Sequence, residues 1–424
     1  MNIQQINAIL ESNSFDSMIR SLGNEDVMSE KKRIRSLLKK TEEIFQEGDY
    51  ALFSSPGRSE IGGNHTDHQQ GRVIAAAIQP DMMAIAKRNE LHVIRIISEG
   101  FEIQPIDLND LWIHENERHH TEALIRGIAS RFHQLGYSLG GFDAVMDSRV
   151  PLGSGMSSSA CFEVLCALIL NEFYMQNKIS PEEIAQIAQY AENEYYQKPC
   201  GLLDQMAISC GGFTYIDFLD KEKPQIEKLT FDFQKHGYGL ILTQTHQDHE
   251  HLSDEYAAIF SEMKDVARSL GGEFLAQTSF KDFLMQASII SQQLKNDRAI
   301  LRALHFYEEN ERVLKQKQAI ENQNILELMQ LMKASGNSSF MLLQNIYSSK
   351  TTHLQAVSLA LAFSQFFLKD EGICRVHGGG FGGTIQAVVP VSLIQEYIHL
   401  METFFGFGSS RLVNIRSSGA CRIL

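Results

Sequence analysis

The chain has 424 residues, 43% of them hydrophobic and 21% charged, which is typical of a globular protein of two or three domains. Its formal net charge of −14, from 38 basic and 52 acidic residues, argues against a nucleic-acid-binding surface. Six cysteines without a C-x-x-C pair, no signal peptide and no apolar run of membrane-spanning length favour a cytoplasmic protein without a membrane partner.

The first half of the chain predicts a mixture of helices and strands. Segment 29–46, with Ser29 as N-cap and Gly48 beyond its end, predicts an amphipathic helix. Hydrophobic patterns then predict strands at 51–55, 73–78, 82–88, 91–98 and 142–148, and helices at 121–136, 161–176 and 181–196.

In the second half, a charged run at 219–237 interrupts the apolar patterns, and we place a domain boundary there. The expected division is a helical extension over 1–48, an N-terminal domain over 49–220 and a C-terminal domain over 221–424. A strand is expected at 238–245, helices around 252–270, 297–318, 324–346 and 354–368, and a strand–glycine loop–strand at 373–390. Because strands and helices do not alternate strictly, the pattern indicates an α+β fold.

The glycine- and serine-rich loop PLGSGMSSSA, residues 151–160, lies between an expected strand and an expected helix. Glycines let backbone amides approach a ligand closely, and a helix start favours phosphate even in an acidic protein. The alternative is a helix start that its serines merely cap. The P-loop, the G-x-G-x-x-G fingerprint and the protein-kinase motifs are absent from the sequence.

This loop resembles the phosphate loop of the GHMP kinases, the small-molecule kinases that include galactokinase, homoserine kinase and mevalonate kinase. Two further stretches, SSPGRSEIGGNHTDHQQG at 54–71 and GGGFGGT at 378–384 after Arg375, resemble the other motifs of the family, in family order. The resemblance implies a two-domain α+β fold. A ribosomal S5 domain 2-like N-terminal domain and an α/β C-terminal domain would enclose the active site in their cleft.

Within this family the chain looks most like the galactokinases. Residues 56–71 resemble the signature P-G-R-x-x-x-x-G-E-H-T-D-x-x-x-G, and PCGLLDQ at 199–205 resembles the segment with the catalytic aspartate. Segments 302–313 and 331–335 are also similar, so the resemblance runs from about residue 50 to residue 424. It implies ATP-dependent phosphorylation of the anomeric hydroxyl of galactose, with ATP and a small sugar as the partners.

The resemblance assigns a role to each matching residue. Asp204 would accept the proton of the sugar hydroxyl, and Arg58 would keep that carboxylate ionised. The nucleotide contacts would be Gly153, Gly155, Ser157, Ser158 and Ser159.

Magnesium would be held by Ser158 or Ser159 together with Glu192, since such oxygen ligands suit Mg²⁺. The alternative for Glu192 is a solvated helix charge beside Glu194.

The sugar contacts implied by the resemblance are Asn64, His65, Asp67, Gly201 and Tyr256. Two departures from the family pattern bear on the choice of sugar. Asn64 stands where the signature has glutamate, and Ile259 and Phe260 replace an arginine pair. An amide at position 64 leaves galacturonate, N-acetylgalactosamine or arabinose open as substrates beside galactose.

Three other interpretations compete with this one. The run of His246, His249 and His251 with Asp248 has a spacing possible for zinc. A non-catalytic sugar sensor of the same fold is a second, disfavoured by the intact Arg58 and its partner aspartate. A mevalonate or homoserine kinase is a third, disfavoured by the sugar-kinase motifs. The sequence does not indicate the oligomeric state.

Overall fold

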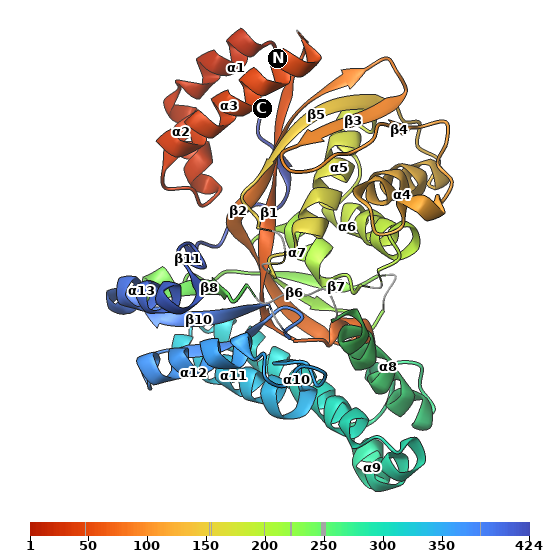
Figure 1. The fold of residues 1–424 in the computed structure, drawn as a ribbon, viewed down its shortest axis with the longest axis vertical. Helices are drawn as coiled ribbons and strands as arrows, with labels where there is room; N and C mark the ends of the chain where they lie inside the picture. Colours follow the sequence, from red (N-terminus) through yellow and green to blue (C-terminus); the bar gives the residue numbers. More distant parts are fainter. Residues whose placement is uncertain are drawn as a thin grey trace.

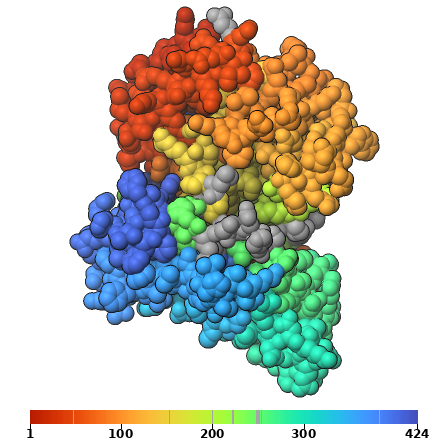
Figure 2. All heavy atoms as spheres, viewed as in Figure 1, coloured from red at the N-terminus to blue at the C-terminus, as the bar shows by residue number. Residues whose placement is uncertain are grey.

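The computed structural model describes residues 1–46, 48–151, 153, 155–198, 200–220, 223–246, 252–381 and 383–424. Two β-sheets organise the chain, each packed with helices (Figure 1). The red to yellow-green first half forms the upper part of the molecule. Most of the cyan to blue second half forms the lower part, as the space-filling view also shows (Figure 2), while the C-terminus lies beside the N-terminal helices in the upper part.

The first sheet has eight strands in the order β12-β1-β2-β5-β3-β4, with β6 paired to β2 and β7 paired to β6. The long strand β2 holds it together, because residues 82–89 pair with β5 while residues 72–76 pair with β6. The strands are β1 (Ala51–Gly62), β2 (Arg72–Asn89), β3 (Val93–Ser98), β4 (Ile106–Asp107), β5 (Gly141–Ser148), β6 (Phe213–Asp217), β7 (Gln225–Leu229) and β12 (Cys421–Arg422).

Helices cover both faces of this sheet, and successive residues of β2 face opposite sides, as the period of a strand requires. Met83 and Ile85 pack with the N-terminal helices, whereas Ala84 and Ala86 pack with the helices of the other face. The N-terminal helices are α1 (Ile3–Leu10), α2 (Asn13–Ser21) and α3 (Val27–Phe45); the others are α4 (Thr121–Gln134), α5 (Ser158–Tyr174), α6 (Pro181–Tyr190) and α7 (Leu203–Cys210).

The second sheet is antiparallel, in the order β11-β8-β10-β9. Here too the side chains alternate: Ile385 and Ala387 pack toward α12 and α13, while Val388 packs toward α10 and α11. The elements are β8 (Tyr238–Gln244), β9 (Ile373–His377), β10 (Thr384–Pro390), β11 (Ser410–Val413), α10 (Asp297–Glu321), α11 (Ile325–Ser338), α12 (Ala356–Leu368) and α13 (Ile394–Phe405).

Helices α8 (Ser253–Ser269) and α9 (Phe280–Leu294) extend from the lower part and pack with α10 around a separate hydrophobic cluster (Figure 1). That cluster also contains Phe381, so it reaches the loop between β9 and β10. No helix in the described part of the chain is both long and apolar enough to cross a membrane.

The α+β architecture expected from the sequence is observed. The first sheet continues through β7 and also receives β12 from the other end of the chain. The domain boundary at residue 220 stays a prediction.

Several elements differ from the sequence predictions. Strand β1 continues to Gly62, although Pro56 and Gly57 pointed to a loop. Irregular pairing with β2 at Pro56/Gly57 and at Glu60/Gly62 lets the strand accommodate these residues. The strands predicted at 73–78 and 82–88 are one strand, and α1, α2 and α9 were not predicted. Arg58 therefore stands on a strand rather than on a loop.

The N-terminal helices are fastened to the first sheet by Arg33, whose side chain is 7% exposed. Its Nη1 lies 2.6 Å from Oδ1 of the buried Asp81, and its Nη2 donates to the Asp147 carbonyl at 3.0 Å. We expect Arg33→Ala to lower the free energy of unfolding by about 3–5 kcal/mol, because it leaves a buried carboxylate short of its partner. Equilibrium urea denaturation measures this.

The control is Arg20→Ala, since Arg20 is exposed on α2. It should change the free energy of unfolding by no more than about 0.5 kcal/mol. Equal stability of the two variants would contradict the fastening role of Arg33.

Candidate active site

The centre of the site is the ion pair between Arg58 on β1 and Asp204 in the first turn of α7. It is bidentate: Arg58 Nε lies 2.6 Å from Oδ1 and Nη2 lies 2.8 Å from Oδ2, a geometry that suits guanidinium and carboxylate. Ser157 also donates its hydroxyl to Asp204. Burial alone would raise the pKa of Asp204, but the Arg58 charge and these hydrogen bonds lower it below its ordinary value, so the carboxylate is ionised.

Arg58 also contacts the phosphate-loop segment, residues 151–160. Its Nη1 donates to the Gly155 carbonyl, and its backbone N–H donates to the Met156 carbonyl at 3.2 Å. Gly153 and Gly155 have φ values of +64° and +68°, in the left-handed region that favours glycine. One arginine therefore contacts both this loop and the acid.

Helix α5 begins directly after this loop, at Ser158. Its N-cap, Ser157, makes no side-chain cap hydrogen bond, since its hydroxyl is directed to Asp204 instead. The first backbone N–H groups of this 17-residue helix therefore receive no cap from the Ser157 side chain, at the place where an anion binds best. The alternative of a serine-capped helix start does not hold for Ser157.

Asp67 and Gly201 meet at the other side of Asp204. A Cβ at Gly201 would lie 1.7 Å from Oδ2 of Asp67, so only glycine lets the backbone run this close to the carboxylate. Burial, and next the charge of Asp204, raise the pKa of Asp67 to about 7. Asp67 lies in the short connection between β1 and β2, in the 3₁₀ turn Asp67–Gln69.

The third glycine motif, GGGFGGT at residues 378–384, accepts hydrogen bonds from three predicted sugar contacts. Its successive carbonyls are those of residues 378–380. The first accepts from the Asn64 amide at 2.8 Å, the second from His65 Nε2 at 3.1 Å and the third from the Tyr256 hydroxyl at 3.1 Å. Burial lowers the pKa of His65 to about 4, so this ring is neutral. These side chains join the β1–β2 connection and α8 to the loop between β9 and β10.

Asn64 is fully buried, and protein groups use its whole hydrogen-bonding capacity. Besides the carbonyl of residue 378, its amide N–H₂ donates to Glu60 at 3.1 Å. Its oxygen accepts from Ser339 at 3.1 Å and from Asn345 at 2.9 Å. An amide side chain has two donor hydrogens and two acceptor lone pairs, so all four are occupied.

The predicted metal residues Ser159 and Glu192 lie together, with the Ser159 hydroxyl 3.3 Å from Glu192 Oε1. Glu192 stands in a π-helical turn, Ala191–Tyr195, that follows α6, a feature frequent at functional sites. Its carboxylate also accepts from Lys198 at 2.9 Å and from Gln205 at 2.8 Å. Glu192 is therefore buried and paired, and the alternative of a solvated helix charge does not hold.

Glu163 adds a second acid to this cluster. Burial, and next the neighbouring Glu192, raise the pKa of Glu163 well above its ordinary value. Oε1 of Glu163 and Oε1 of Gln205 are buried and receive no hydrogen bond. Buried oxygen atoms without donors beside a serine hydroxyl and a carboxylate fit Mg²⁺, which prefers oxygen ligands and takes several of them from water and phosphate.

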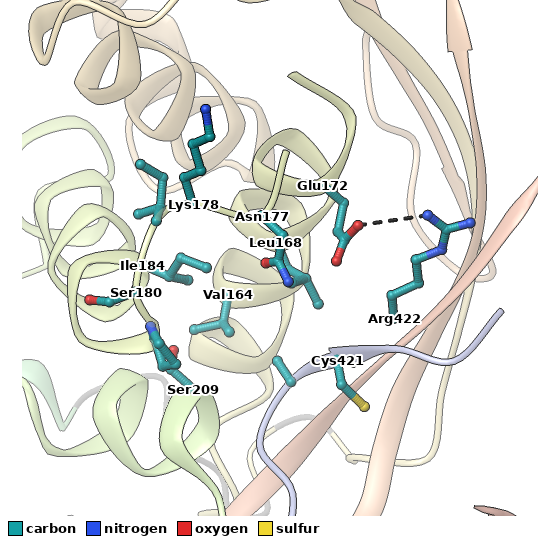
Figure 3. Close-up of a pocket in the computed structure, with 13 residues that line it drawn as sticks. Val164, Leu168, Glu172, Asn177, Lys178, Ser180, Ile184, Ser209, Cys421 and Arg422 are labelled. Carbon is teal, nitrogen blue, oxygen red and sulfur yellow. Dashed lines mark ion pairs between the residues drawn. The ribbon is translucent and has the colours of Figure 1, made fainter. Parts of the chain in front are cut away.

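Two hollows of the described surface lie away from this centre. One, of about 390 Å³, lies between α5, α6, α7 and β12 and is bordered by the ion pair of Glu172 and Arg422 (Figure 3). A second, of about 490 Å³, lies beside Arg72 and Tyr307. No residue predicted for the site lines either hollow. The site is therefore located by the hydrogen bonds among its residues and not by either of these cavities.

Sequence reasoning missed four polar residues that complete this region: Lys198, Gln205, Glu60 and His377. Lys198 directly precedes the PCGLLDQ motif, Gln205 is its last residue, and His377 directly precedes the third glycine motif. Proximity to a motif was therefore the signal in the sequence that could have found them.

Of the predicted zinc ligands, residues 248, 249 and 251 lie outside the described part of the chain. Within that part, no three His, Cys, Asp or Glu residues are grouped to hold a metal ion.

Comparison with protein families gives two matches. The model of the GHMP kinase N-terminal domain matches residues 123–212, which include the phosphate-loop segment, Glu192 and Asp204. The model of the galactokinase galactose-binding signature matches residues 41–88, which include Arg58 and Asp67.

Individual proteins agree with these matches. A galactokinase of Clostridium tetani is 27% identical over 370 residues, which cover 86% of this chain and 90% of the relative. A galactokinase of Bacillus subtilis is 28% identical over 361 residues, which cover 82% of this chain and 87% of the relative.

Solved structures give the same fold. A Lactococcus lactis galactokinase complexed with galactose superposes with a TM-score of 0.78 at 23% identity, covering 91% of this chain and 98% of that one. A mevalonate kinase of Methanococcus jannaschii superposes with a TM-score of 0.60 at 16% identity, and the match covers 87% of this chain and 99% of that one. The predicted two-domain α+β fold of the GHMP kinases is confirmed. The two sequence relatives named above are both galactokinases.

The pKa of Asp67 predicts a pH dependence of sugar use. The carboxyl is protonated below about pH 7 and then cannot accept two sugar hydroxyls, so kcat/KM for the sugar should fall as the pH falls through 7, by about tenfold per unit. His65 and His68 are neutral in this range because burial lowers the pKa of each.

Initial rates at low sugar concentration between pH 5.5 and 8.5 measure this dependence. Asp67→Asn should lower kcat/KM most above pH 7, where the wild-type carboxyl is ionised, and should remove the inflection. An inflection that persists in Asp67→Asn would assign the titration to another group.

Proposed function

We propose that this chain transfers the terminal phosphoryl group of ATP to the anomeric hydroxyl of galactose, giving galactose 1-phosphate and ADP. One observation supports this most directly: Arg58 holds an ionised Asp204 while it contacts the phosphate-loop segment. A nucleotide phosphate in this loop and a sugar hydroxyl at Asp204 would be neighbours. The galactokinase relatives and their shared signature favour galactose as the acceptor.

Asp204 acts as the base in this proposal. Its ionised carboxylate accepts the proton of the attacking hydroxyl, a contribution of about 10²–10⁴-fold in rate. Arg58 keeps that carboxylate ionised before the reaction. It also places positive charge beside the oxygens of the transferred phosphoryl group, where phosphoryl transfer depends most on positioning and electrostatics.

Asp67 is the main sugar acceptor in this proposal, with Gly201 leaving room for the carboxylate. His65 adds a neutral ring whose proton is on Nε2, because that atom donates to a carbonyl of the third glycine motif, so its Nδ1 is an acceptor. Tyr256 packs edge-on against Phe381, with ring centroids 5.1 Å apart, and borders the same region.

Asn64 shapes the site without selecting the sugar. Contact with a sugar hydroxyl would require it to give up one of four protein hydrogen bonds. The replacement of the glutamate of the signature therefore does not by itself move the preference from galactose to another sugar.

Magnesium belongs to this proposal through Ser159 and Glu192, with Ser158 as the alternative hydroxyl. When bound, the ion would neutralise charge on the nucleotide phosphates. The paired Lys198 supplies a positive charge beside Glu192 at 2.9 Å. Glu163, kept neutral by burial and by Glu192, adds no second negative charge to the same cluster.

A coupled assay of ADP release over a sugar panel tests the reaction. With galactose, galacturonate, N-acetylgalactosamine and arabinose, we expect galactose to give the highest kcat/KM. Asp204→Asn should lower kcat by about 10²–10⁴-fold while the Kd for ATP changes by less than about threefold. Isothermal titration calorimetry of the same variant measures that Kd.

The outcomes separate the alternatives. Near-normal turnover in Asp204→Asn would contradict its role as the base. A tenfold higher kcat/KM with another sugar of the panel would overturn galactose and leave the kinase activity standing. Thermal stabilisation by galactose and ATP without ADP release would favour the sugar sensor.

The metal proposal predicts that Glu192→Gln raises the Mg²⁺ concentration needed for half-maximal ADP release by at least about tenfold. The matched control is Glu194→Gln, because Glu194 is two residues away and exposed, and it should leave the requirement unchanged. A magnesium titration at saturating ATP and galactose compares the two variants. If both variants need the same Mg²⁺ concentration for half-maximal ADP release, Glu192 is not a magnesium ligand.

A further inference from the structure

His377, the last residue of β9, is a buried imidazole that the proposed reaction does not yet use. Its side chain is 1% exposed. In the strand register it lies opposite Thr384, the first residue of β10, so these two residues close the third glycine motif at its base. One ring nitrogen, Nδ1, is buried and has no hydrogen-bond partner. An unpaired polar atom in the protein interior is costly and calls for an explanation.

The surroundings of the other nitrogen determine where the ring proton lies. The backbone N–H of Glu60 donates to Nε2 at 3.2 Å, so Nε2 acts as an acceptor. Ser59 Oγ lies 3.1 Å from the same atom and itself accepts from Gln386 Nε2 at 2.7 Å. The Ser59 hydroxyl proton is therefore available for Nε2, which receives two donors. A neutral imidazole with Nε2 as acceptor carries its proton on Nδ1.

The charge of the ring follows from its neighbours. Burial, and next the positive charges of Arg58 and Arg375, lower the pKa of His377 well below its ordinary value. The ring is neutral at physiological pH. It offers one fixed N–H donor and brings no additional positive charge beside the two guanidinium groups.

That donor lies beside the phosphate-loop segment. A Cβ built on Gly155 would lie 3.2 Å from His377 Nδ1 and 3.4 Å from the Thr384 Cβ. A Cβ on Gly378 would lie 3.5 Å from the Gly155 carbonyl oxygen and 4.0 Å from Arg58 Nη2. The phosphate-loop segment and the third glycine motif thus meet at Gly155, and His377 Nδ1 lies where they meet, near Arg58.

We propose that His377 is a phosphate-binding residue, whose Nδ1–H donates a hydrogen bond to a phosphoryl oxygen of the nucleotide held in the loop at Gly155. The inference rests on the proposed ATP-dependent reaction and adds a contact from the second sheet. It explains why a buried donor is left without a protein partner, since the partner arrives with the nucleotide. It also explains why both acceptor contacts of the ring are made on Nε2 alone.

Nitrogen-15 NMR of the histidine rings in the full-length wild-type protein tests the donor directly. We expect His377 with its proton on Nδ1, and a shift of that nitrogen signal on adding the ATP analogue AMP-PNP with Mg²⁺ but not on adding galactose alone. His305 is the internal control, because it is fully buried and donates from Nε2 to the Asn64 carbonyl at 2.9 Å. Its proton should be on Nε2, and its signals should not move with the nucleotide.

Two variants separate the ring nitrogens. The amide N–H₂ of asparagine reaches the Nδ1 position, whereas that of glutamine reaches the Nε2 position. We expect His377→Gln to raise the Kd for AMP-PNP, measured by calorimetry, by about tenfold or more, as for the loss of a hydrogen bond to a charged group. His377→Asn should stay within about threefold, and the Kd for galactose should be unchanged in both.

Each outcome decides the proposal. A His377 proton on Nε2, an Nδ1 signal that ignores the nucleotide, or equal Kd values for the two variants would overturn it, and the first two need no variant to fold. Failure of the wild type to bind AMP-PNP at all would instead contradict the proposed kinase activity. Turnover and nucleotide binding by a wild type whose His377 signal does not move would refute the phosphate contact alone.

Discussion

The arrangement of the site depends on one side chain, Arg58. Its guanidinium pairs with Asp204 through two hydrogen bonds, and the same group bonds the Gly155 carbonyl. The acid, the phosphate-loop segment and strand β1 are therefore fixed relative to one another by a single planar cation. Arginine suits this task better than lysine, because its rigid fork can satisfy a carboxylate and a carbonyl in fixed directions at once. The bond from Ser157 to Asp204 then leaves the first amides of α5 without a side-chain cap.

A second constraint joins the two sheets. The carbonyls of residues 378–380 accept hydrogen bonds from Asn64, His65 and Tyr256, which come from the β1–β2 connection and from α8. A relative shift of the two sheets would break several of these bonds together, so the sugar side of the site and the third glycine motif are positioned as one unit. The residues expected to contact the sugar thus also fix the position of one sheet relative to the other.

The sequence predicted the strongly periodic elements well, and the reasons for its failures are physical. The helix expected at 29–46 is observed at Val27–Phe45, and the strand expected at 238–245 at Tyr238–Gln244. Strand β1 was predicted too short, because only its pairing with β2 overrides the loop signal of Pro56 and Gly57. The motifs identified Arg58, Asp204 and Ser157, which the fold brings together. They did not reveal the environment of Asn64, since its partners in the third glycine motif and at Asn345 lie 314 and 281 residues away.

The pairing of β12 with β1 has a consequence for biosynthesis. Arg416 is fully buried and bonds Ser54 at 2.6 Å across 362 residues of sequence, and Cys421 pairs with the same Ser54 in the sheet. During translation, β1, β2 and β5 leave the ribosome long before this last strand exists. The edge of β1 that pairs with β12 is therefore unpaired while the whole second sheet is synthesised. Such an edge invites non-native strand pairing, so the nascent chain is exposed to misfolding until β12 pairs with β1.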